Sequence, residues 1–497
     1  MDFAQWSAVA IYAVLCSAGG GGVLRLLRLP RDPLVHNWAG CYFAGQLVLT
    51  VLVLSTGLLP IGLGAVLGAV AAFGIGTLAV VFRRGWPEWA KRPWPAAGIA
   101  LLWLALFPQL LVIVHATAPT EWDARSIWLF HGKGLLWGDG VGAAFFGDVQ
   151  FWWSSPDYPL HIPVQAACCA RLFGSWDDQV ARAFLLVDFL AYGRLLLPIL
   201  RARGHGTVAA IAVGTLLFAQ GVPSFVIGDP YVSGQADYHY ALPLALALLA
   251  LAPPSGASGR AIAALLAARA AAVKNEGMLY VFVALALWLG AAAWRRLRAH
   301  PRPRWRDVVP RPRGPVVGAV LALALPTLLW SVWKRSHGVA GGLHLAERVM
   351  TRGLLWDALA ERTRVVLSFL TGELAANWTL WLLAAWVLLL GAGAVVGRAA
   401  SGTSWGRHET MVALALLGAC GMVFMTYVLS PHDAEFHMRT SARRVLFFPH
   451  LLAFVLCVFR LEALQRAPRA GVGGARTDRD RAGDTGPARL NRRAVRE

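Results

Sequence analysis

TEWDARSIWLFHGKGLLWGDG, residues 120–140, decides the fold of this chain, because it places a charged, tryptophan-rich segment between two strongly apolar ones. A short run rich in glycine and aromatic residues follows, and then SSPDYPLHIP (154–163). Lys133, one of only four lysines in the protein, lies inside the first stretch. A charged loop of this length beside a membrane span indicates a site at the boundary between water and lipid, not a simple connector.

The composition identifies the solvent in which the chain folds. The protein has 497 residues, of which 57% are hydrophobic and only 15% are charged. In a soluble domain, charged residues make up about a quarter of the chain. We therefore predict an all-α polytopic membrane protein, with the lipid bilayer as its environment.

Apolar windows recur along the chain at the length of about 20 residues that a helix needs to cross the hydrocarbon core. They lie at 7–24, 39–58, 61–82, 96–116, 178–200, 207–228, 239–253, 315–334, 376–396, 410–430 and 445–461. Two shorter windows, 261–273 and 277–293, flank KNEG at 274–277, and we expect 160–174 to be a short interfacial or re-entrant helix. The pattern predicts a bundle of about 11 to 13 transmembrane helices, with a large first outer loop that contains short interfacial helices.

The net charge of +19 is distributed in a way that sets the orientation of the chain. The excess of arginine and lysine occurs in short loops at 25–31, 83–92, 201–203 and 295–313, and in the tail after Arg460. This is the pattern of the positive-inside rule, so we expect these segments in the cytoplasm and no nucleic acid as a partner.

The same rule places the polar loops on the opposite side of the membrane. With the basic segments inside, the loops at 117–160, 229–238, 335–375 and 431–443 fall outside, and KNEG lies near the outer face. Every loop that mixes acids, bases and histidines is therefore on one side. We expect residues 117–163 and 431–443 to meet over one cavity there.

Two motifs in the first outer loop carry candidate functional carboxylates. Asp123 lies just past the end of an apolar window, with Glu121 beside it, where a carboxylate can accept a proton or bind a divalent cation. Two prolines bracket Asp157 and Tyr158 and stiffen the entry into the next helix. The structural alternatives are a helix cap around Asp123 and a plain loop-to-helix turn at Asp157.

Two further motifs place charge at a helix end or between apolar windows. Asp237 comes at the start of a window and can line a cavity, although an acid there also favours a helix N-terminus. In KNEG, Lys274 and Glu276 lie between two short windows, where ionisable groups pair with each other or face a polar cavity. An internal salt bridge without a substrate is the alternative. If the cavity admits a phosphate, Lys274 is a natural ligand for it.

The segment SPHDAEFHMRTSARR (430–444) departs from the orientation rule. An outer loop should be poor in arginine, yet this one contains Arg439, Arg443 and Arg444. Because arginine binds phosphate through a fork of two donors, the excess favours an anionic ligand. Acids and histidines, among them Glu435 and His437, lie in the same segment.

A family resemblance rests on five motifs taken in order. They are EWDARSIW (121–128) followed by Lys133, DYPLHIP (157–163), GQAD (234–237), KNEG (274–277) and EFHMRTSARR (435–444). This ordered set, which spans roughly residues 95–460, resembles a group of bacterial integral-membrane glycosyltransferases of the GT-C superfamily. The protein O-mannosyltransferases and the lipid A aminoarabinose transferase are more distant relatives of that group. The order is more specific than any single motif.

The resemblance implies a division of the chain and a type of reaction. N-terminal transmembrane helices at 1–94 would precede a GT-C-like catalytic transmembrane core at 95–462 and a disordered, arginine-rich cytoplasmic tail at 463–497. Such enzymes transfer a sugar from a polyprenyl-phosphate carrier to an acceptor on the outer side of the membrane. An acidic residue of the first large outer loop is their catalytic carboxylate, a role that falls on Asp123. The chain departs from the pattern at His131, where a lysine is expected.

The chemistry of this transfer assigns roles to the candidate residues. Displacing polyprenyl phosphate from an anomeric carbon requires a base for the acceptor hydroxyl and cations for the departing phosphate. We expect Asp123 to be the base, with Glu121 as the alternative. The candidates for binding the donor phosphate are Lys274, Arg443 and Lys133. The candidates for binding sugar or acceptor are Asp157, Tyr158, Asp237, Glu276, Glu435 and His437. A divalent cation, Mg²⁺ or Mn²⁺, stays open as a cofactor, because the sequence has no diagnostic ligand set.

The sequence therefore predicts a multi-pass glycosyltransferase of the bacterial cytoplasmic membrane whose active site faces the periplasm. Its partners would be a polyprenyl-phosphate-linked sugar and a glycan, lipid or protein that offers a hydroxyl. The alternatives are a flippase or transporter of lipid-linked sugars and a polysaccharide polymerase or ligase. A transporter usually shows related halves, which this sequence does not. The absence of a P-loop argues against an ATP-driven pump.

Overall fold

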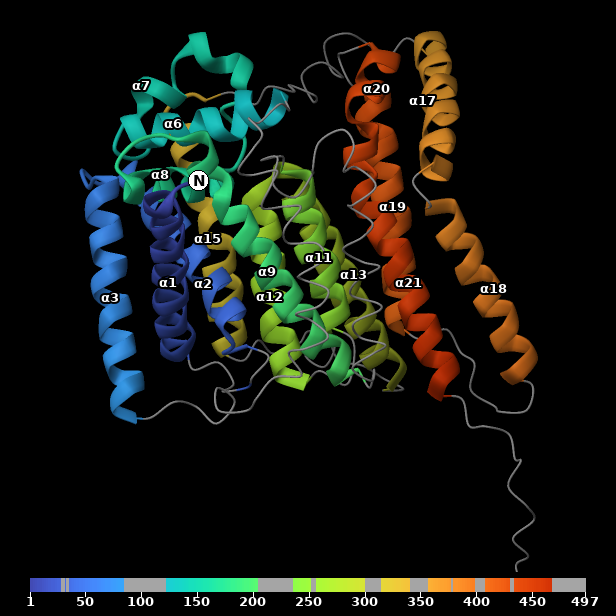
Figure 1. Ribbon diagram of the computed structural model, residues 1–497. Helices are drawn as coiled ribbons and strands as arrows, with labels where there is room; N and C mark the ends of the chain where they lie inside the picture. Colours follow the sequence, from blue (N-terminus) through green and yellow to red (C-terminus); the bar gives the residue numbers. More distant parts are fainter. Residues whose placement is uncertain are drawn as a thin grey trace, which may run out of the picture.

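The computed structural model describes eleven parts of the chain. They are residues 1–27, 32, 35–84, 122–203, 236–251, 256–299, 314–339, 356–376, 379–397, 407–429 and 433–466. Within these parts the regular structure is helical throughout, and the helices stand side by side with a cap of shorter helices over one end (Figure 1). The protein is an all-α polytopic membrane protein, as the composition predicts.

The first three helices are α1 (Phe3–Leu26), α2 (Trp38–Thr56) and α3 (Leu63–Arg84). Glycines let α1 and α2 come into close contact, because a Cβ atom on Gly45 would lie 1.9 Å from the carbonyl oxygen of Cys16. On the other side of the contact, a Cβ on Gly20 would lie 1.8 Å from the carbonyl oxygen of Cys41. Small residues allow such close packing of helices in a membrane, where there is no hydrophobic drive between them.

The cap is formed by five short elements. They are the π-helix η1 (Ala124–Trp128), α6 (Leu129–Trp137), α7 (Ala143–Phe146), the 3-10 helix η2 (Val149–Ser154) and α8 (His161–Phe173). Aromatic rings hold them together, since the ring of Phe145 lies 5.0 Å from those of both Phe130 and Phe151. The 13-residue helix α8 is too short to cross a membrane. The prediction of short helices within the first large loop is thus confirmed.

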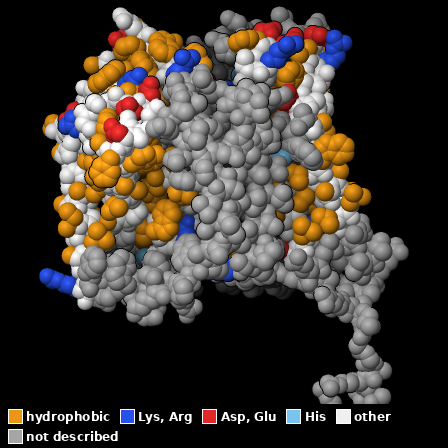
Figure 2. Space-filling model, in the orientation of Figure 1, with side chains coloured by type: hydrophobic (Ala, Val, Ile, Leu, Met, Phe, Trp, Pro, Cys, Tyr) orange, Lys and Arg blue, Asp and Glu red, His pale blue; other side chains and the backbone are white. Residues whose placement is uncertain are grey.

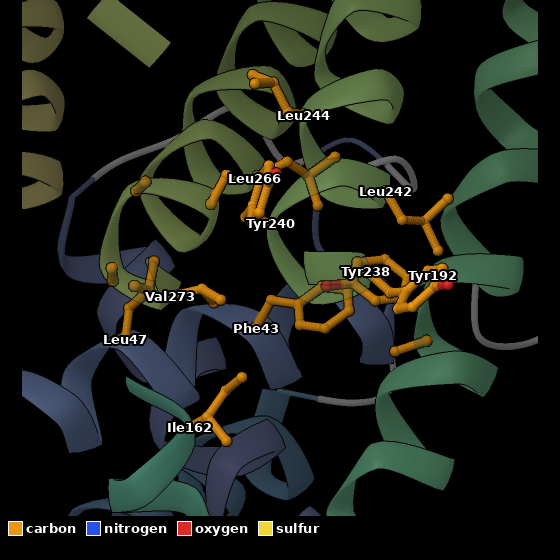
Figure 3. Close-up of a cluster of buried hydrophobic side chains, with 14 of the residues drawn as sticks. Phe43, Leu47, Ile162, Tyr192, Tyr238, Tyr240, Leu242, Leu244, Leu266 and Val273 are labelled. Atoms are coloured by element: carbon orange, nitrogen blue, oxygen red, sulfur yellow. The ribbon is translucent and has the colours of Figure 1, made fainter. Parts of the chain in front are cut away.

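The middle of the bundle contains α9 (Asp178–Ala202), α11 (Asp237–Leu251), α12 (Gly256–Val273), α13 (Asn275–Ala299) and α15 (Gly314–Ser336). Their apolar side chains meet those of α2 and α8 in one core (Figure 3). The ring of Phe43 of α2 lies 4.8 Å from that of Tyr192 of α9 in this core. Lys274 joins α12 to α13 with no longer loop between them.

The C-terminal part contains α17 (Trp356–Ala376), α18 (Thr379–Gly397), α19 (Arg407–Leu429), α20 (Ala434–Val445) and α21 (Phe447–Arg466). Two pairs bend sharply, α17 with α18 by 68° and α20 with α21 by 52°. The upper members, α17 and α20, rise to the level of the cap in Figure 1.

Six helices are long and apolar enough to cross a membrane, or up to eight if each bent pair is one span. The six lie in α1, α2, α3, α9, α12 and α19, and this number covers only the described residues. The predicted windows 96–116 and 207–228 lie outside those residues, so the total of about 11 to 13 spans stays a prediction. Most of the tail expected at 463–497 lies outside them as well.

The two ends of the bundle differ in charge. Apolar side chains cover the flanks, and charged side chains gather at the end that carries the cap, α17 and α20 (Figure 2). Helices α3, α9 and α13 all finish at the opposite end (Figure 1), where the basic segments 83–92, 201–203 and 295–313 begin. The structure therefore places the charged cap and the ends of α3, α9 and α13, which lead into these basic segments, at opposite ends of the bundle. This arrangement agrees with the orientation rule.

Candidate functional site

Two buried charges predicted from the sequence pair at the capped end of the bundle. Nζ of Lys274 donates to Oδ1 of Asp237 at 2.8 Å. Lys274 is 7% exposed and Asp237 is 2% exposed. Burial alone disfavours the ammonium, but the carboxylates of Asp237 and Glu276 outweigh it and raise the pKa of Lys274 well above its usual value. The lysine is therefore a permanent cation.

The local sequence explains why the pair forms here. Asp237 is the first residue of α11, where the partial positive charge of a helix N-terminus favours a carboxylate. Lys274 follows directly on α12, and the chain turns at once into α13. A Cβ atom on Gly277 would lie 2.2 Å from the carbonyl oxygen of Ala270. The glycine of KNEG is therefore required for the tight turn that presents Lys274.

Arg444 of α20 brings the cap into the same site. Its Nη1 donates to Oδ2 of Asp123, which precedes η1, and lies 3.8 Å from Oδ2 of Asp237. The side chains of Arg444 and Asp123 keep 20% and 25% of their surface exposed. Arg444, the residue after segment 431–443, thus contacts Asp123 of segment 117–163. That the two segments meet over one cavity stays a prediction.

The site has more negative than positive groups. Glu276 lies 3.5 Å from Nζ of Lys274 through Oε1, and its buried Oε2 has no hydrogen-bond partner among the described residues. Three carboxylates thus face two cations in what we name the charged cluster. The charged cluster consists of Asp123, Asp237, Lys274, Glu276 and Arg444. One carboxylate is therefore left without a cation of its own in this cluster.

The DYP motif forms one wall of the charged cluster. The ring of Tyr158 lies 5.9 Å below Nζ of Lys274 and packs 5.3 Å from the ring of Trp128. Burial, and then the charge of Glu276, raises the pKa of Tyr158, so its hydroxyl stays protonated. Tyr158 can therefore donate a hydrogen bond to an anionic or sugar oxygen.

Asp157 is fixed through its backbone as well as its carboxylate. Nδ2 of Asn275 donates to Oδ2 of Asp157 at 3.3 Å. The backbone carbonyl of Asp157 accepts from Nζ of Lys334 at 2.8 Å and from Nε1 of Trp330 at 3.2 Å. The last turns of α15 thus support the site, a contribution that was not predicted from the sequence. The available signal was Lys334, which is one of the four lysines of the chain.

Three candidates lie away from the charged cluster. Lys133 lies 3.6 Å from Asp178 and 5.5 Å from the centre of the Trp176 ring. The ring of His437 packs 4.8 Å from that of Tyr427. Glu435 pairs with Arg439 on an exposed face of α20, nine residues before Arg444 and so about 13 Å from it along the helix.

Glu435 lines a separate groove between α17 and α20, with a volume of about 590 Å³. Its lining residues include Arg364, Phe369, Glu373, Glu435 and Arg439. The groove is open, and its four charged residues balance in sign. Whatever occupies it, the groove is distinct from the charged cluster.

Two of the predicted site residues are not fully described in the structure. Glu121 is one of them, and of Arg443 the structure describes the backbone within α20 but not the side chain. Within the described ranges, no group of three or more histidine, cysteine, aspartate or glutamate side chains is placed to bind a metal ion. The role of Mg²⁺ or Mn²⁺ stays a prediction.

A second polar group, deep in the bundle, was not predicted. Arg269 of α12 donates through Nη2 to Oδ2 of Asp188 on α9, and both side chains are fully buried. Nε2 of Gln46 and the hydroxyl of Tyr42 donate to Oδ1 of Asp188 at 2.8 and 2.9 Å. The available signals were the charged residues inside the apolar windows 178–200 and 261–273, because ionisable groups in a span are rarely without a role.

No protein-family model, no curated protein and no solved structure matches this chain. What the site can do follows from its own groups. The partly exposed carboxylate of Asp123, which can accept a proton, lies beside two cations that can bind an anionic oxygen. These are the elements of a group transfer with an anionic leaving group.

Proposed function

We propose that the protein is a glycosyltransferase that moves a sugar from a polyprenyl-phosphate carrier to an acceptor hydroxyl. The observation that carries the proposal is the convergence of Asp123, Lys274 and Arg444 from three distant segments at the capped end of the bundle. The ordered motifs shared with GT-C glycosyltransferases supply the reaction type. The proposal includes a GT-C-like core at 95–462 with about 11 to 13 spans.

The reaction balances with the groups present. The acceptor oxygen forms a bond to the anomeric carbon, the bond from that carbon to the phosphate oxygen breaks, and the phosphate leaves with the electron pair. Asp123 accepts the proton of the acceptor hydroxyl. Lys274 and Arg444 stabilise the charge that develops on the departing phosphate. In this proposal Tyr158, Asp157 and the carboxylates of Asp237 and Glu276 would bind sugar or acceptor hydroxyls.

The ion pair between Arg444 and Asp123 makes the order of binding important. A carboxylate that is paired with a guanidinium is a poor proton acceptor, because protonation gives up the pairing. A donor phosphate can accept two hydrogen bonds from the guanidinium of Arg444, and the arginine would then release Asp123. We therefore expect the donor to bind first and to produce the active base.

The location of the site is part of the proposal. The charged cluster lies at the end of the bundle opposite the basic segments, which fits an active site on the periplasmic face of a bacterial cytoplasmic membrane. Polyprenyl-phosphate sugars are membrane-bound, so their phosphate would reach a site at this level. The acceptor is a glycan, lipid or protein that offers its hydroxyl from the same side.

The test is an assay of the purified protein with a panel of polyprenyl-phosphate sugars, scored for release of polyprenyl phosphate. We expect release with at least one sugar when an acceptor extract of the cell envelope is added, and release that is slower by about 10²-fold or more with Asp123→Asn. Failure of every donor in the panel to bind or react, with protein that remains folded, would overturn the proposal.

A flippase or transporter of lipid-linked sugars is the second candidate. The buried pair of Asp188 and Arg269 favours it, because ionisable groups in the middle of a bundle often mark a transport path. Reconstituted vesicles separate the two functions. Movement of a fluorescent lipid-linked sugar between leaflets without release of polyprenyl phosphate supports the transporter, and phosphate release without movement supports the transferase.

A further inference from the structure

A proline inside α11 leaves one backbone carbonyl without its helical partner. In an α-helix the carbonyl of His239 would accept from the backbone N–H of residue 243, but that residue is Pro243, which has no N–H. Nη1 of Arg269, on α12, donates to this carbonyl at 3.1 Å. The arginine thus replaces the missing backbone donor, as buried polar groups must in a membrane protein.

Arg269 itself is held on every side. Its Nη2 is paired with Asp188, its Nη1 also donates to the hydroxyl of Tyr192, and its Nε donates to Oε1 of Gln46 at 3.1 Å. The guanidinium lies 5.0 Å from the centre of the Phe43 ring, and Figure 3 shows Phe43 and Tyr192 in this part of the core. A side chain fixed in this way also restricts the position of the carbonyl to which it donates.

The carbonyl that Arg269 binds belongs to the turn that presents Asp237. His239 lies two residues after Asp237 in the first turn of α11, and Lys274 lies five residues after Arg269 at the end of α12. The two helix ends are thus joined at two points, by Arg269 to the His239 carbonyl and by Lys274 to Asp237.

We propose that Arg269 is a positioning residue that fixes the first turn of α11 and thereby sets the contact between Asp237 and Lys274. Asp188 acts by holding the guanidinium in place. The inference concerns the geometry of the charged cluster and goes beyond the proposed function, since it holds for either a transferase or a transporter. It also gives a role to Pro243, which removes the backbone donor that Arg269 replaces.

The test uses the reactivity of Lys274 toward a water-soluble amine reagent, measured by mass spectrometry on the purified full-length protein. Lys133, which lies away from the cluster, serves as the internal reference. The variant Asp188→Asn/Arg269→Met removes both charges together, so no unpaired charge is left in the core. Methionine has no donor for the His239 carbonyl. We expect the labelling rate of Lys274 to rise about tenfold relative to Lys133.

The rescue experiment separates positioning from general stability. Adding Pro243→Ala to the double variant restores a backbone N–H for the His239 carbonyl, and labelling should return to within about threefold of the parent protein. Adding Pro198→Ala in α9 is the matched control, since it also repairs a proline in a helix but not this carbonyl. We expect no rescue from it.

Two outcomes would overturn the inference: unchanged Lys274 labelling in the double variant, or equal rescue by the two alanine substitutions. If the double variant does not fold, Arg269→Lys replaces it. A lysine keeps the charge opposite Asp188 but cannot supply the fork that reaches both partners, so the same rise and the same selective rescue are expected. Because labelling requires no substrate, failure of glycosyl transfer leaves this result intact.

Discussion

Nη1 of Arg444 donates to Oδ2 of Asp123, although 321 positions of sequence separate the two residues. This contact ties the cap to α20 and brings a candidate base next to a candidate phosphate ligand. Arg444 also lies 3.8 Å from Asp237, which is itself bound to Lys274. Substitutions at these positions should therefore have effects that are not additive.

Replacing Asp123 by asparagine tests the base. Asp123→Asn keeps the shape of the side chain but cannot take up a proton, so we expect the transfer rate to fall by about 10²- to 10⁴-fold. Donor binding should be equal or tighter, because the variant no longer occupies Arg444 with a carboxylate. Single-turnover rates and equilibrium binding of the same polyprenyl-phosphate sugar measure the two effects separately.

The control for this substitution is Asp178→Asn, which removes a carboxylate that faces Lys133 away from the charged cluster. Its transfer rate should stay within about threefold of the parent protein, as is usual for an exposed pair. Near-normal turnover by Asp123→Asn would move the role to Glu121 or remove it altogether.

Removing the cations tests the phosphate site. Lys274→Ala and Arg444→Ala should each weaken donor binding by about 10- to 100-fold, because each removes a charged hydrogen bond to the phosphate. The loss of binding free energy in the double variant should be smaller than the sum of the losses in the two single variants, since both charges bind one phosphate. Titration of all three variants with one donor measures the coupling.

Arg439→Ala is the matched control, because this arginine lies on the same helix and pairs with Glu435 on an exposed face. We expect no more than a twofold change in donor binding, roughly what an exposed pair contributes. Full additivity of the two cluster variants would instead assign Lys274 and Arg444 to different partners. Arg443→Ala belongs in the same series, since the sequence favoured that residue.

The sequence predicted which segments contribute to this site, but it did not predict which face of each helix points toward the site. Asp237 and Lys274 could be placed at helix ends because apolar windows stop there, and the structure pairs them. The choice between Arg443 and Arg444 depends on which face of α20 points to the cap. Neighbouring residues differ by about 100° around a helix, and α20 packs at a bend that composition does not reveal.

The pair of Asp188 and Arg269 shows the other limit. Asp188 shares its apolar window with Arg182 and Arg194, and a sequence separation of 81 positions gives no sign that its partner is Arg269. Their contact depends on the helical packing that brings α9, α11 and α12 together. Pro243 did not reveal the contact either, because a proline in a membrane helix shows that a carbonyl lacks its backbone donor but not which side chain will bind that carbonyl.

At the end of the bundle opposite the charged cluster, Arg203 and Glu462 form another buried pair. Nε of Arg203 donates to Oε1 of Glu462 at 2.7 Å, and Nη1 donates to the carbonyl of Leu249 at 3.1 Å. Glu462→Gln leaves a buried guanidinium without its carboxylate, so we expect a loss of about 3 kcal/mol in stability. Arg203→Met/Glu462→Met should recover most of it, as measured by thermal unfolding in detergent.

His131 gives the cap a sensitivity to acid. Its Nε2 lies 3.1 Å from Oγ of Ser154, and burial lowers the pKa of His131 to about 3. The ordinary value is about 6.5, so below that pH the unfolded chain takes up a proton that the folded cap excludes. Stability should then fall by about 2 kcal/mol between pH 6.5 and pH 5 and be unaffected above pH 7.

His131→Gln isolates this effect from the titration of carboxylates elsewhere in the cap. Glutamine keeps a donor for Ser154 but carries no titratable group, so the melting temperature of the variant should decline less than that of the parent protein as the pH falls from 7 to 5. The difference between the two curves should be close to constant above pH 7, where the histidine is neutral in both the folded and the unfolded state. Parallel curves down to pH 5 would show that protonation of His131 does not oppose the folding of the cap.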